Sequence, residues 1–305
     1  MHTPNWTAAN LPHMSSRTVV VTGASSGLGL VTASQLASAG ATVVLAVRNL
    51  SKGRSVAASL PGRTEVRELD LADLSSVRAF AAAWTRPLDI LINNAGIMQV
   101  PEGRTVDGFE LQIGTNHLGP FALTNLLLSH ITSRVVTISS QLHARGRIRL
   151  DDLNWRSRRY NALQAYQDSK LANVLFTVEL QRRLAEAESS VRAVSAHPGI
   201  ARTNLVDHVG GVYRLLNPVL QRIFNDAERG ALPTLYAATQ DVPGGSYVGP
   251  NGLGHLRGYP VVHSASRAAR DAQTAQQLWE LSARVTNTGW SLSSNTGPQG
   301  KPIAA

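Results

Sequence analysis

The stretch "RTVVVTGASSGLG", residues 17–29, decides the fold. It begins as a run of β-branched apolar residues, which is typical of a buried strand, and passes into a turn that holds three glycines. The next segment, "VTASQLASAG" (31–40), has the composition of a helix that stops at a glycine. Glycines let a backbone approach a phosphate closely, and the following helix offers its N-terminal amides to it. The stretch therefore predicts a phosphate-binding strand–turn–helix unit, with an ordinary tight turn as the alternative.

Strand-like and helix-like segments alternate along the rest of the chain. The predicted strands are 17–23, 41–47, 64–70, 88–94, 133–140, 191–197 and 244–250, and helices are predicted at 74–84, 108–130 and 163–186. The strands are continuous apolar runs, as expected when helices cover both faces of a sheet. The alternation predicts an α/β fold, a Rossmann-type doubly wound parallel sheet of about seven strands in a single domain. We expect that domain at 15–287, with loosely ordered ends at 1–14 and 288–305.

The composition excludes several classes of protein. With 305 residues, 43% of them hydrophobic and 16% charged, the chain can bury a sizeable core. It has no cysteine, which excludes disulfides, a thiol nucleophile and a thiolate metal site, and which fits a cytoplasmic location. The N-terminal residues lack the apolar core of a signal peptide, and no run of 18 apolar residues predicts a membrane span. No histidine or carboxylate cluster has the spacing of metal ligands, so we expect no metal.

The net charge of +9 calls for a nucleic-acid hypothesis. Six arginines crowd the segment 141–160, namely Arg145, Arg147, Arg149, Arg156, Arg158 and Arg159. A basic loop of this kind attracts acidic substrates, RNA or a membrane surface, or is simply solvated. No nucleic-acid-binding motif accompanies it, so we expect a solvated loop and no nucleic-acid partner.

The ends of the predicted strands carry the residues that distinguish nucleotides. Val47 and Arg48 end the second strand, where NAD-binding chains place a carboxylate on the ribose. A guanidinium pairs with a 2′-phosphate instead, which favours NADP(H) over NAD(H), a solvated arginine being the alternative. Asp70 follows the third strand and either bonds an adenine amino group or caps a helix. Gly96 in "NNAG" allows close approach of the backbone to a cofactor, and a structural tie between loops is the alternative role for Asn93 or Asn94.

The segment "AYQDSK" (165–170) carries the candidate chemistry. Tyr166 and Lys170 are four residues apart and share one face of the predicted helix. A nearby ammonium favours the phenolate, so we expect Lys170 to lower the pKa of Tyr166 and make it a usable general acid and base. The pair alone is equally a core tyrosine and a surface lysine. Two further polar positions support the first interpretation: the serines of "TISS" at the end of the fifth strand, and Asn116 inside a helix that it disfavours.

These motifs together resemble the short-chain dehydrogenase/reductase family. "TGASSGLG", "NNAG", "ISS", "YQDSK" and "HPGIART" occur in the family's order, over residues 15 to 285. "SKLANVLFTVEL" and the long interval before Tyr166 are similar to the branch that includes retinol dehydrogenases and protochlorophyllide reductases. The resemblance implies an NADP(H)-dependent oxidoreductase, a ketoreductase-type enzyme that interconverts an alcohol and a ketone or aldehyde on a fairly apolar small molecule. The alternatives are reduction of an activated C=C bond, which the missing cysteine disfavours, and a non-catalytic NADP-binding sensor.

The resemblance also implies a role for each motif residue. Tyr166 exchanges a proton with the substrate oxygen, and Lys170 lowers its pKa and holds the nicotinamide ribose. Ser140, rather than Ser139, steadies the carbonyl. Asn116 holds a water that links Lys170 to solvent. The expected cofactor-binding residues are Gly23, Ser25, Ser26, Gly27, Leu28, Gly29, Arg48, Asp70, Leu71, Asn94, Ala95, Gly96, Tyr166, Lys170, Pro198, Gly199 and Thr203.

Three further expectations concern the surroundings of the site. The apolar, helix-like segment 204–230 follows the sixth strand and is predicted to form a substrate lid. The expected substrate-contacting residues are Ser140, His143, Leu205, Val209 and Tyr213, with Leu216 also on the inner face of the lid and with a packing role as the alternative for His143. Pro120 predicts a break in the 108–130 helix just after Asn116. Homodimers or homotetramers through helices 108–130 and 163–186 are common in the family and are possible partners here.

Overall fold

The structure of the protein is a computed structural model, which describes residues 5–199 and 227–290. The described residues form one eight-stranded sheet in the order β3-β2-β1-β4-β5-β6-β7-β8. The strands are β1 (Thr18–Thr22), β2 (Thr42–Val47), β3 (Arg63–Glu68), β4 (Leu88–Asn93), β5 (Ile131–Ile138), β6 (Arg192–Ala196), β7 (Tyr247–Pro250) and β8 (Pro260–His263). The main helices are α1 (Gly27–Ser38), α2 (Leu50–Ser59), α3 (Leu74–Ala82), α4 (Leu111–Ile113), α5 (Gly119–Leu127), α6 (Ala162–Glu186), α9 (Ala227–Thr239) and α10 (Ala272–Thr286).

The sheet is doubly wound, as predicted. Strands β1 to β7 pair in parallel, and the strand order reverses at β1, which lies between β2 and β4. In folds of this kind ligands bind at the carboxyl ends of the strands beside that reversal. The eighth strand, β8, was not predicted; it pairs antiparallel with β7. Its four residues are too few to show a period of their own, so the strand depends on its neighbour.

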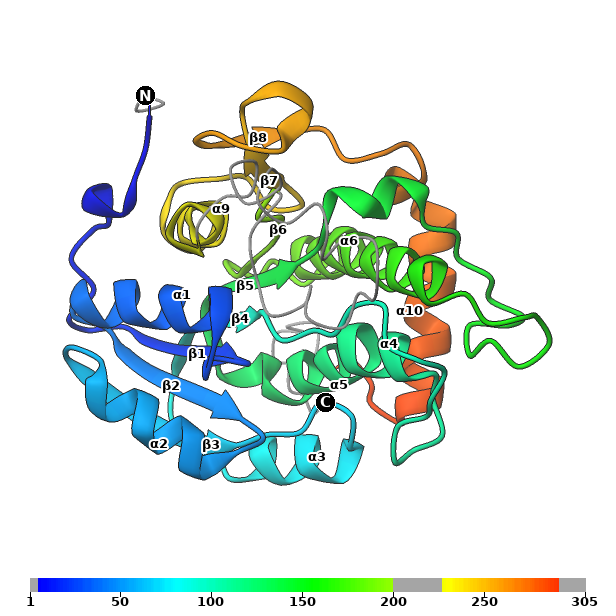
Figure 1. Ribbon diagram of the computed structural model, residues 1–305, viewed down its shortest axis with the longest axis horizontal. Coiled ribbons are helices and arrows are strands. Elements are labelled where there is room, and N and C mark those ends of the chain that lie inside the picture. The colour runs from blue at the N-terminus through cyan, green and yellow to red at the C-terminus, as the bar shows by residue number, and fades with distance from the viewer. Residues whose placement is uncertain (1–4, 200–226, 291–305) are drawn as a thin grey trace, which may run out of the picture.

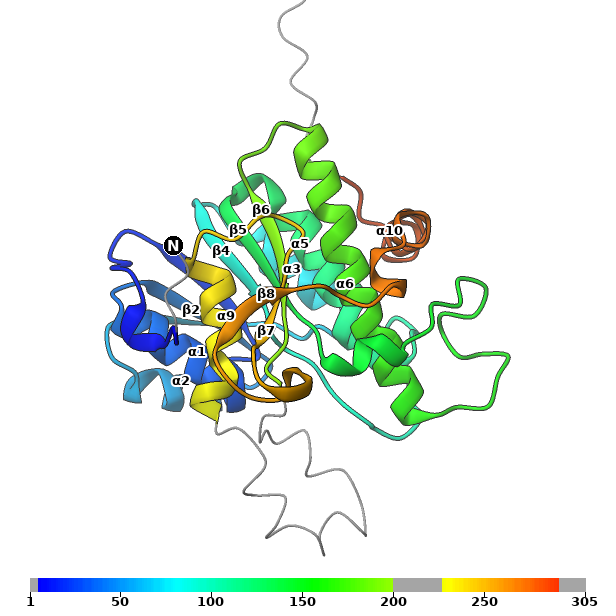
Figure 2. The same ribbon diagram turned by 90° about the horizontal axis from the view of Figure 1, so that it is seen from above.

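Helices cover the two faces of the sheet (Figure 1), and an apolar core lies on each face. One core lies under α3, α5, α6 and α10, and the other lies under α1 and α9. Helix α10 packs outside α6 and α5 rather than directly on the sheet (Figure 2). Between β5 and α6 the chain forms a short helix, η4 (Gln141–Arg145), and then a loop that extends away from the body. Four short 3-10 turns complete the described chain: η1 (Ala8–Asn10), η3 (Leu128–His130), η6 (Leu253–His255) and η7 (Ala268–Arg270).

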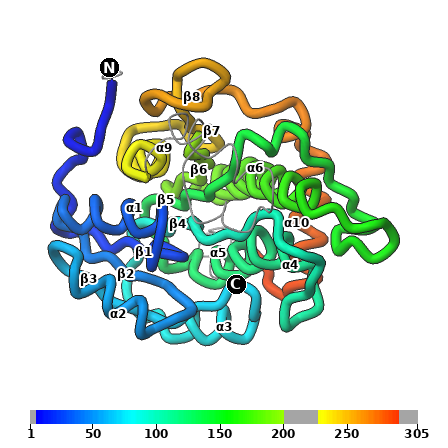
Figure 3. Tube along the Cα trace, in the orientation of Figure 1, coloured from blue at the N-terminus to red at the C-terminus, as the bar shows by residue number. Residues whose placement is uncertain are grey.

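The expectation of a loose N-terminal end is wrong for residues 5–14. This segment runs beside α9 (Figure 3), where Trp6 is only 2% exposed and meets Tyr236 edge to face at 5.3 Å. Met14 is buried in the same core. At the other end, Trp290 packs near Trp279 of α10, so residues 288–290 also belong to the folded part. A lone tryptophan in a polar segment carries no periodic signal, so the sequence pattern did not reveal this packing.

Helical backbone runs without interruption from Leu111 to His130, and the irregularity expected just after Asn116 takes the form of a π-helical segment rather than a break. This helical stretch consists of α4, a π-helical segment η2 (Gly114–Leu118), α5 and the 3-10 turn η3. Pro120 lies in the first turn of α5, directly after the π-helical segment, and its missing N–H interrupts the hydrogen-bond ladder there. The π-helical segment contains Asn116, and such segments occur frequently at functional sites.

Candidate active site

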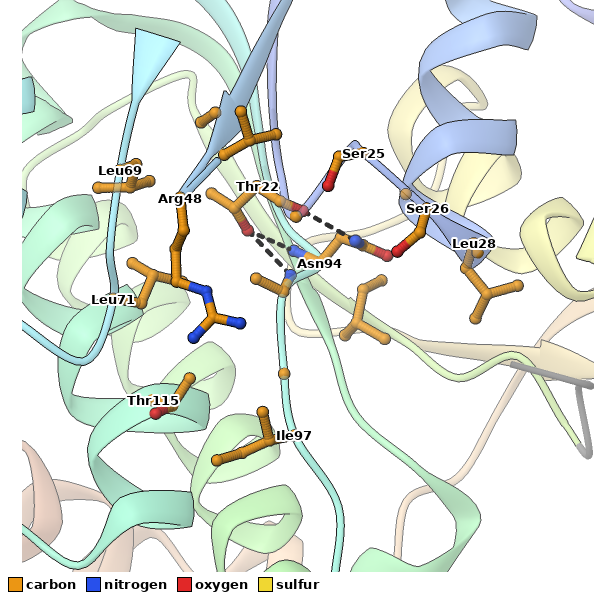
Figure 4. Close-up of a pocket in the computed structure, with 18 of the residues that line it drawn as sticks. Thr22, Ser25, Ser26, Leu28, Arg48, Leu69, Leu71, Asn94, Ile97 and Thr115 are labelled. Carbon is orange, nitrogen blue, oxygen red and sulfur yellow. Dashed lines mark hydrogen bonds between the residues drawn. The ribbon is translucent and has the colours of Figure 1, made fainter. Parts of the chain in front are cut away.

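A cavity of about 440 Å³ opens at the carboxyl ends of β1, β2, β4 and β5 (Figure 4). The predicted cofactor-binding residues that line it are Gly23, Ser25, Ser26, Gly27, Leu28, Gly29, Arg48, Asp70, Leu71, Asn94, Ala95, Gly96, Tyr166, Lys170 and Pro198. The prediction missed Thr22, Ala46, Val47, Asn49, Lys52, Leu69, Ile97, Met98, Val100, Thr115, Ile138 and Ser139. Most of the missed residues are apolar neighbours of predicted ones, so they shape the wall of the cavity and offer no reactive group.

The glycine-rich turn leaves the cavity open where a pyrophosphate would lie. Gly23 has a left-handed φ of 68° and packs so closely on Ala95 that a Cβ would lie 2.9 Å from the alanine Cβ. A Cβ on Gly29 would lie 2.6 Å from the carbonyl oxygen of Gly23, so any side chain there collides with backbone. The N-cap of α1, Ser26, makes no capping hydrogen bond with its side chain. The first amides of α1 are thus left for a ligand, and the residues present fit a bound dinucleotide.

The end of β2 carries two cations rather than a carboxylate. Arg48 and Lys52 both line the cavity and are exposed, and no acidic residue occurs between them. The side chain of Asn49 caps α2 by accepting a hydrogen bond from the Lys52 backbone. Gly53 lets the helix lie against β2, since a Cβ there would lie 2.6 Å from a Val47 methyl. A lysine in the first turn opposes the helix dipole, which is a signal in the sequence that could have found Lys52.

The contacts of Asp70, Asn93 and Asn94 show which of these side chains face the cavity and which hold the fold together. Asp73, not Asp70, is the N-cap of α3, so Asp70 remains at the cavity, where its carboxylate accepts from the Ala72 amide at 2.9 Å. Asn93 is buried and donates to Thr124 Oγ1 at 2.9 Å, so it ties β4 to α5. Asn94 donates to the Thr22 carbonyl at 2.8 Å (Figure 4), and it also lines the cavity.

Tyr166 and Lys170 lie in the second and third turns of α6, at the inner end of the cavity. They are 6% and 4% exposed, and the Lys170 Nζ lies 5.7 Å from the centre of the Tyr166 ring. The Lys170 ammonium donates to the Ile138 carbonyl at 3.1 Å, at the end of β5. A Cβ on Gly96 would lie 3.3 Å from that ammonium, which is why the "NNAG" loop can approach it.

The two serines after β5 differ in what they contact. Ser139 is buried, and its hydroxyl donates to the Lys170 carbonyl at 2.8 Å, which ties the strand to α6. The side chain of Ser140 is close enough to Tyr166 to lower the pKa of that phenol. Its hydroxyl also accepts from the Leu142 amide at 3.2 Å. Ser139 lines the cavity whereas Ser140 does not, so the expected role of Ser140 in holding a substrate carbonyl stays a prediction.

Asn116 connects three parts of the site. Its Oδ1 accepts from the Ile97 amide at 2.7 Å, and its Nδ2 donates to the Ile97 carbonyl at 2.9 Å and to Ser169 Oγ at 2.9 Å. The Ser169 hydroxyl in turn donates to the Tyr166 carbonyl at 2.8 Å. Through these bonds the π-helical segment fixes both the loop after β4 and the helix that carries Tyr166.

Burial, not the lysine charge, dominates the acid–base properties of the pair. Burial raises the pKa of Tyr166 to about 12, and the hydrogen bond from Ser140 offsets only part of that rise. Burial lowers the pKa of Lys170 to about 8. The expectation that Lys170 lowers the pKa of Tyr166 is therefore not met. Spacing along a helix shows that two groups are neighbours, but it does not show how completely water is removed from both.

Several predicted residues are not brought to the cavity. His143 is 2% exposed, and its ring bonds the Ser140 carbonyl and the Ser266 amide, so it has no free nitrogen for a substrate. Its predicted substrate contact is replaced by a structural role, which was the alternative. Gly199 does not line the cavity and instead packs against Leu256. Thr203, Leu205, Val209, Tyr213 and Leu216 lie outside the described residues, as does the predicted lid except for 227–230, which begin α9.

No helix in the two described ranges is both long and apolar enough to cross a membrane.

A doubly wound sheet, a glycine-rich turn at its reversal point and a serine–tyrosine–lysine set beside it define a nicotinamide-dependent oxidoreductase. The chain belongs to the short-chain dehydrogenase/reductase family, whose model, described as short chain dehydrogenase, matches residues 17–211.

Similar proteins agree with this assignment. Human retinol dehydrogenase 13 is 42% identical over 290 residues, which cover 88% of this chain and 84% of that protein. A crystal structure of an uncharacterized protein from Mycobacterium paratuberculosis is 55% identical, with a TM-score of 0.84 over 94% of this chain and 100% of that one. A gluconate 5-dehydrogenase from Beutenbergia cavernae, described as NAD(P) dependent and with bound NADP, is 27% identical, with a TM-score of 0.57 over 75% of this chain and 92% of that one. The predicted family and its retinol dehydrogenase branch are confirmed.

Proposed function

We propose that the protein is an NADP(H)-dependent oxidoreductase that interconverts an alcohol with an aldehyde or ketone on a fairly apolar small molecule. The observation that carries the proposal is that Tyr166 and Lys170 line the inner end of a cavity whose outer end fits a dinucleotide, with the Ser140 side chain close to the Tyr166 phenol. The retinol dehydrogenases among its relatives are named for an apolar alcohol, which supports the substrate class.

NADP(H) is the cofactor we propose because of the charges in the cavity. Its described lining holds three basic side chains, Arg48, Lys52 and Lys170, and one acidic side chain, Asp70. Two of the basic groups stand together at the end of β2, where a 2′-phosphate distinguishes NADP from NAD. Two cations without a carboxylate between them leave room for either nucleotide. They attract NADP more strongly than NAD, because its 2′-phosphate adds negative charge.

In this mechanism Tyr166 is the group that gives a proton to the substrate carbonyl oxygen. With a pKa raised to about 12, the phenol is protonated at neutral pH and ready to donate. The Ser140 hydroxyl hydrogen-bonds the same oxygen and holds the carbonyl beside the phenol. Lys170 is held by the Ile138 carbonyl, and we assign to its ammonium the role of binding the nicotinamide ribose. Asn116 fixes the helix that carries Tyr166 and Lys170. The nicotinamide, when bound, supplies the hydride.

The test is a comparison of Tyr166→Phe with the unmodified protein, using NADPH and two aldehyde probes, all-trans-retinal and decanal. We expect turnover of at least one probe to an alcohol, and a loss of at least a hundredfold in kcat for the variant, with NADPH affinity retained. Full activity in Tyr166→Phe would falsify the mechanism. Product analysis separates an alcohol product from one in which a C=C bond is reduced, and NADPH binding without any turnover would favour a sensor.

A further inference from the structure

One backbone oxygen, the carbonyl of Ser140, receives an unusual number of hydrogen bonds. The backbone amide of His143 donates to it at 3.0 Å, as in any 3-10 turn. The ring Nδ1 of His143 lies 2.8 Å from it, and the hydroxyl of Tyr247 donates to it at 3.2 Å. Two side chains thus converge on an oxygen whose own turn already satisfies it, and a main-chain carbonyl has only two lone pairs.

The direction of the histidine bond follows from its other nitrogen. The Ser266 amide donates to Nε2 of His143 at 3.2 Å, so that nitrogen carries no hydrogen in the neutral ring. The hydrogen is then on Nδ1, which lies 2.8 Å from the Ser140 carbonyl and 3.1 Å from the Tyr247 hydroxyl and donates mainly to the nearer carbonyl. Burial lowers the pKa of His143, which keeps the ring in this neutral form.

Tyr247 comes from β7 and is held in place on three sides. Its ring stacks on His197 at 4.9 Å and meets the rings of His143 and His263 edge to face at 4.9 and 5.0 Å. His197 and His263 are themselves joined, with 3.1 Å between their Nε2 atoms. Gly249 leaves room for this cluster, because a Cβ there would collide with the His197 ring. The phenol hydroxyl is consequently fixed beside both the Ser140 carbonyl, at 3.2 Å, and His143 Nδ1, at 3.1 Å.

Ser140 has few other restraints on its position. The residue before it is fixed twice, by the Ser139 hydroxyl on α6 and by the Ser139 amide on the Ala196 carbonyl of β6 at 2.7 Å. Ser140 itself is half-buried and lies past the end of β5, and its hydroxyl accepts from the Leu142 amide of the turn that it begins. The peptide that follows it therefore depends on the carbonyl contacts for its orientation, and the direction of the side chain depends on that peptide.

We propose that His143 and Tyr247 are positioning residues, which hold the Ser140 carbonyl and thereby aim the Ser140 hydroxyl at Tyr166 and at the substrate oxygen. The proposal rests on the proposed function, and it adds two residues that touch neither substrate nor cofactor. The substrate class is that of the proposed function, a carbonyl compound whose oxygen lies between Ser140 and Tyr166.

The test uses four variants of the full chain: Tyr247→Phe, His143→Ala, His143→Asn and, as a control, Tyr236→Phe. The asparagine keeps an N–H donor close to the position of Nδ1, whereas the alanine does not. With NADPH and the aldehyde probes, we expect Tyr247→Phe and His143→Ala each to lower kcat about tenfold, the effect of one hydrogen bond, with NADPH affinity unchanged. His143→Asn should stay within about threefold of the unmodified protein. Tyr236, a buried tyrosine in the other core, should affect kcat little.

A pH profile separates positioning from a loss of stability. The Ser140 bond lowers the pKa of Tyr166, so a misplaced Ser140 leaves that pKa higher. In alcohol oxidation Tyr166 must accept a proton, and the rising limb of log kcat against pH should move to higher pH in Tyr247→Phe. The charged and titratable neighbours of Tyr166 that bear on this limb, Lys170 and Tyr247, come from α6 and β7. An unshifted limb, or equal losses in His143→Ala and His143→Asn, would overturn the proposal.

A crystal structure of Tyr247→Phe decides the question even if neither probe is turned over. We expect the Ser140 hydroxyl to be displaced from Tyr166 in the variant, and an unmoved hydroxyl contradicts the proposal. The two levels of inference fail separately. Activity retained in Tyr166→Phe defeats the proposed function, whereas an inactive Tyr166→Phe together with a fully active Tyr247→Phe defeats only the positioning roles.

Discussion

Arg48 and Lys52 are the two residues on which the choice of nucleotide depends. They stand at the outer end of the cavity, where Figure 4 shows the guanidinium of Arg48 extending into the open space between β2 and the helix that carries Thr115. Both are solvent-exposed, so their attraction for a phosphate is screened by salt and shared between them. Neither side chain is expected to contribute much to the free energy of unfolding, so a change in nucleotide affinity in a variant can be attributed to the lost charge.

We predict that Arg48→Asp raises the Kd for NADPH about a hundredfold and Lys52→Gln about tenfold, while the Kd for NADH changes less than threefold. The aspartate adds repulsion to the loss of a bidentate donor, whereas the glutamine only removes a point charge. Fluorescence titration with both nucleotides measures the four constants. Arg54→Gln is the matched control, because Arg54 is exposed on the same helix but does not line the cavity. Equal losses for NADPH and NADH would remove both residues from the choice of nucleotide.

Lys170 shows the conflict between stability and function at a single residue. Its ammonium is 4% exposed, and burial lowers its pKa to about 8 from a usual value of 10.5. At neutral pH the folded chain therefore buries a charge that the unfolded chain would leave in water. The Ile138 carbonyl that it bonds also accepts from Asn173 Nδ2 at 3.0 Å, so the oxygen keeps a partner if the lysine is removed.

We predict that Lys170→Met abolishes turnover but raises the free energy of unfolding at pH 7 by about 1–3 kcal/mol. Between pH 8 and 10.5 the unfolded state binds more protons than the folded state, so the stability of the unmodified protein rises with pH there. The advantage of the variant should shrink across the same window. Urea unfolding at pH 7 and 9.5 measures both values. The exposed Lys52→Met should show no such pH dependence, and a destabilised Lys170→Met at pH 7 would mean that the ammonium is a net stabiliser.

At the scale of elements, the segment that holds Asn116 begins with a buried carboxylate. Glu110 is fully buried and caps α4, accepting from the amides of Gln112 at 2.9 Å and Ile113 at 2.7 Å. It also accepts from the Tyr160 hydroxyl at 3.1 Å, which brings the loop before α6 onto the same cap. Since burial raises the pKa of Glu110, the cap retains a carboxyl group in an apolar setting only because these donors converge on it.

We predict that Glu110→Ala lowers the free energy of unfolding by about 2–4 kcal/mol, because it strands two amides and a phenol, and that Glu110→Gln costs about 1 kcal/mol, because one acceptor oxygen remains. The alanine variant should also lower kcat, since η2 and Asn116 follow the cap directly. Urea unfolding and kinetics with the aldehyde probes measure these effects. The control is Glu186→Ala on the surface of α6, where an exposed ion pair contributes less than about 1 kcal/mol. A Glu110→Ala variant as stable as the control would refute the capping role.

The elements that were predictable are those whose signal is local. The glycine spacing of the first turn and the four-residue spacing of Tyr166 and Lys170 depend on neighbours along the chain, and both predictions located the right faces. An irregularity in the helix near Asn116 was expected from one proline, and a π-helical segment lies there. What could not be predicted depends on tertiary packing: β8 exists because β7 offers an edge, Lys52 reaches the cavity because Gly53 lets α2 lie close to β2, and the high pKa of Tyr166 reflects burial.

At the scale of the whole molecule, α10 changes what the outer face of α5 and α6 can do. Trp279 of α10 meets Phe121 of α5 edge to face at 4.9 Å and stacks on Phe176 of α6 at 5.7 Å. Ser282 hydrogen-bonds the buried His117 at 2.9 Å, and Arg183 lies over the Trp279 ring at 4.6 Å. The face through which the family resemblance suggested homodimers or homotetramers is thus covered by the chain's own helix (Figure 2).

We predict that the protein does not dimerise through α5 and α6, and that light scattering after size-exclusion chromatography gives the monomer mass of 32.6 kDa. Because the chain has no cysteine, single-cysteine variants report directly on α10. Ser282→Cys places a thiol on the face that is fully buried against α5, and Gln277→Cys places one on the exposed face of the same helix. A thiol reagent should label Gln277→Cys at once and Ser282→Cys only on unfolding. Rapid labelling of both variants would show that α10 detaches readily from α5 and α6. If the protein were then also found as a dimer with the Gln277→Cys thiol still exposed, α5 and α6 would be the dimer interface and the prediction would be wrong.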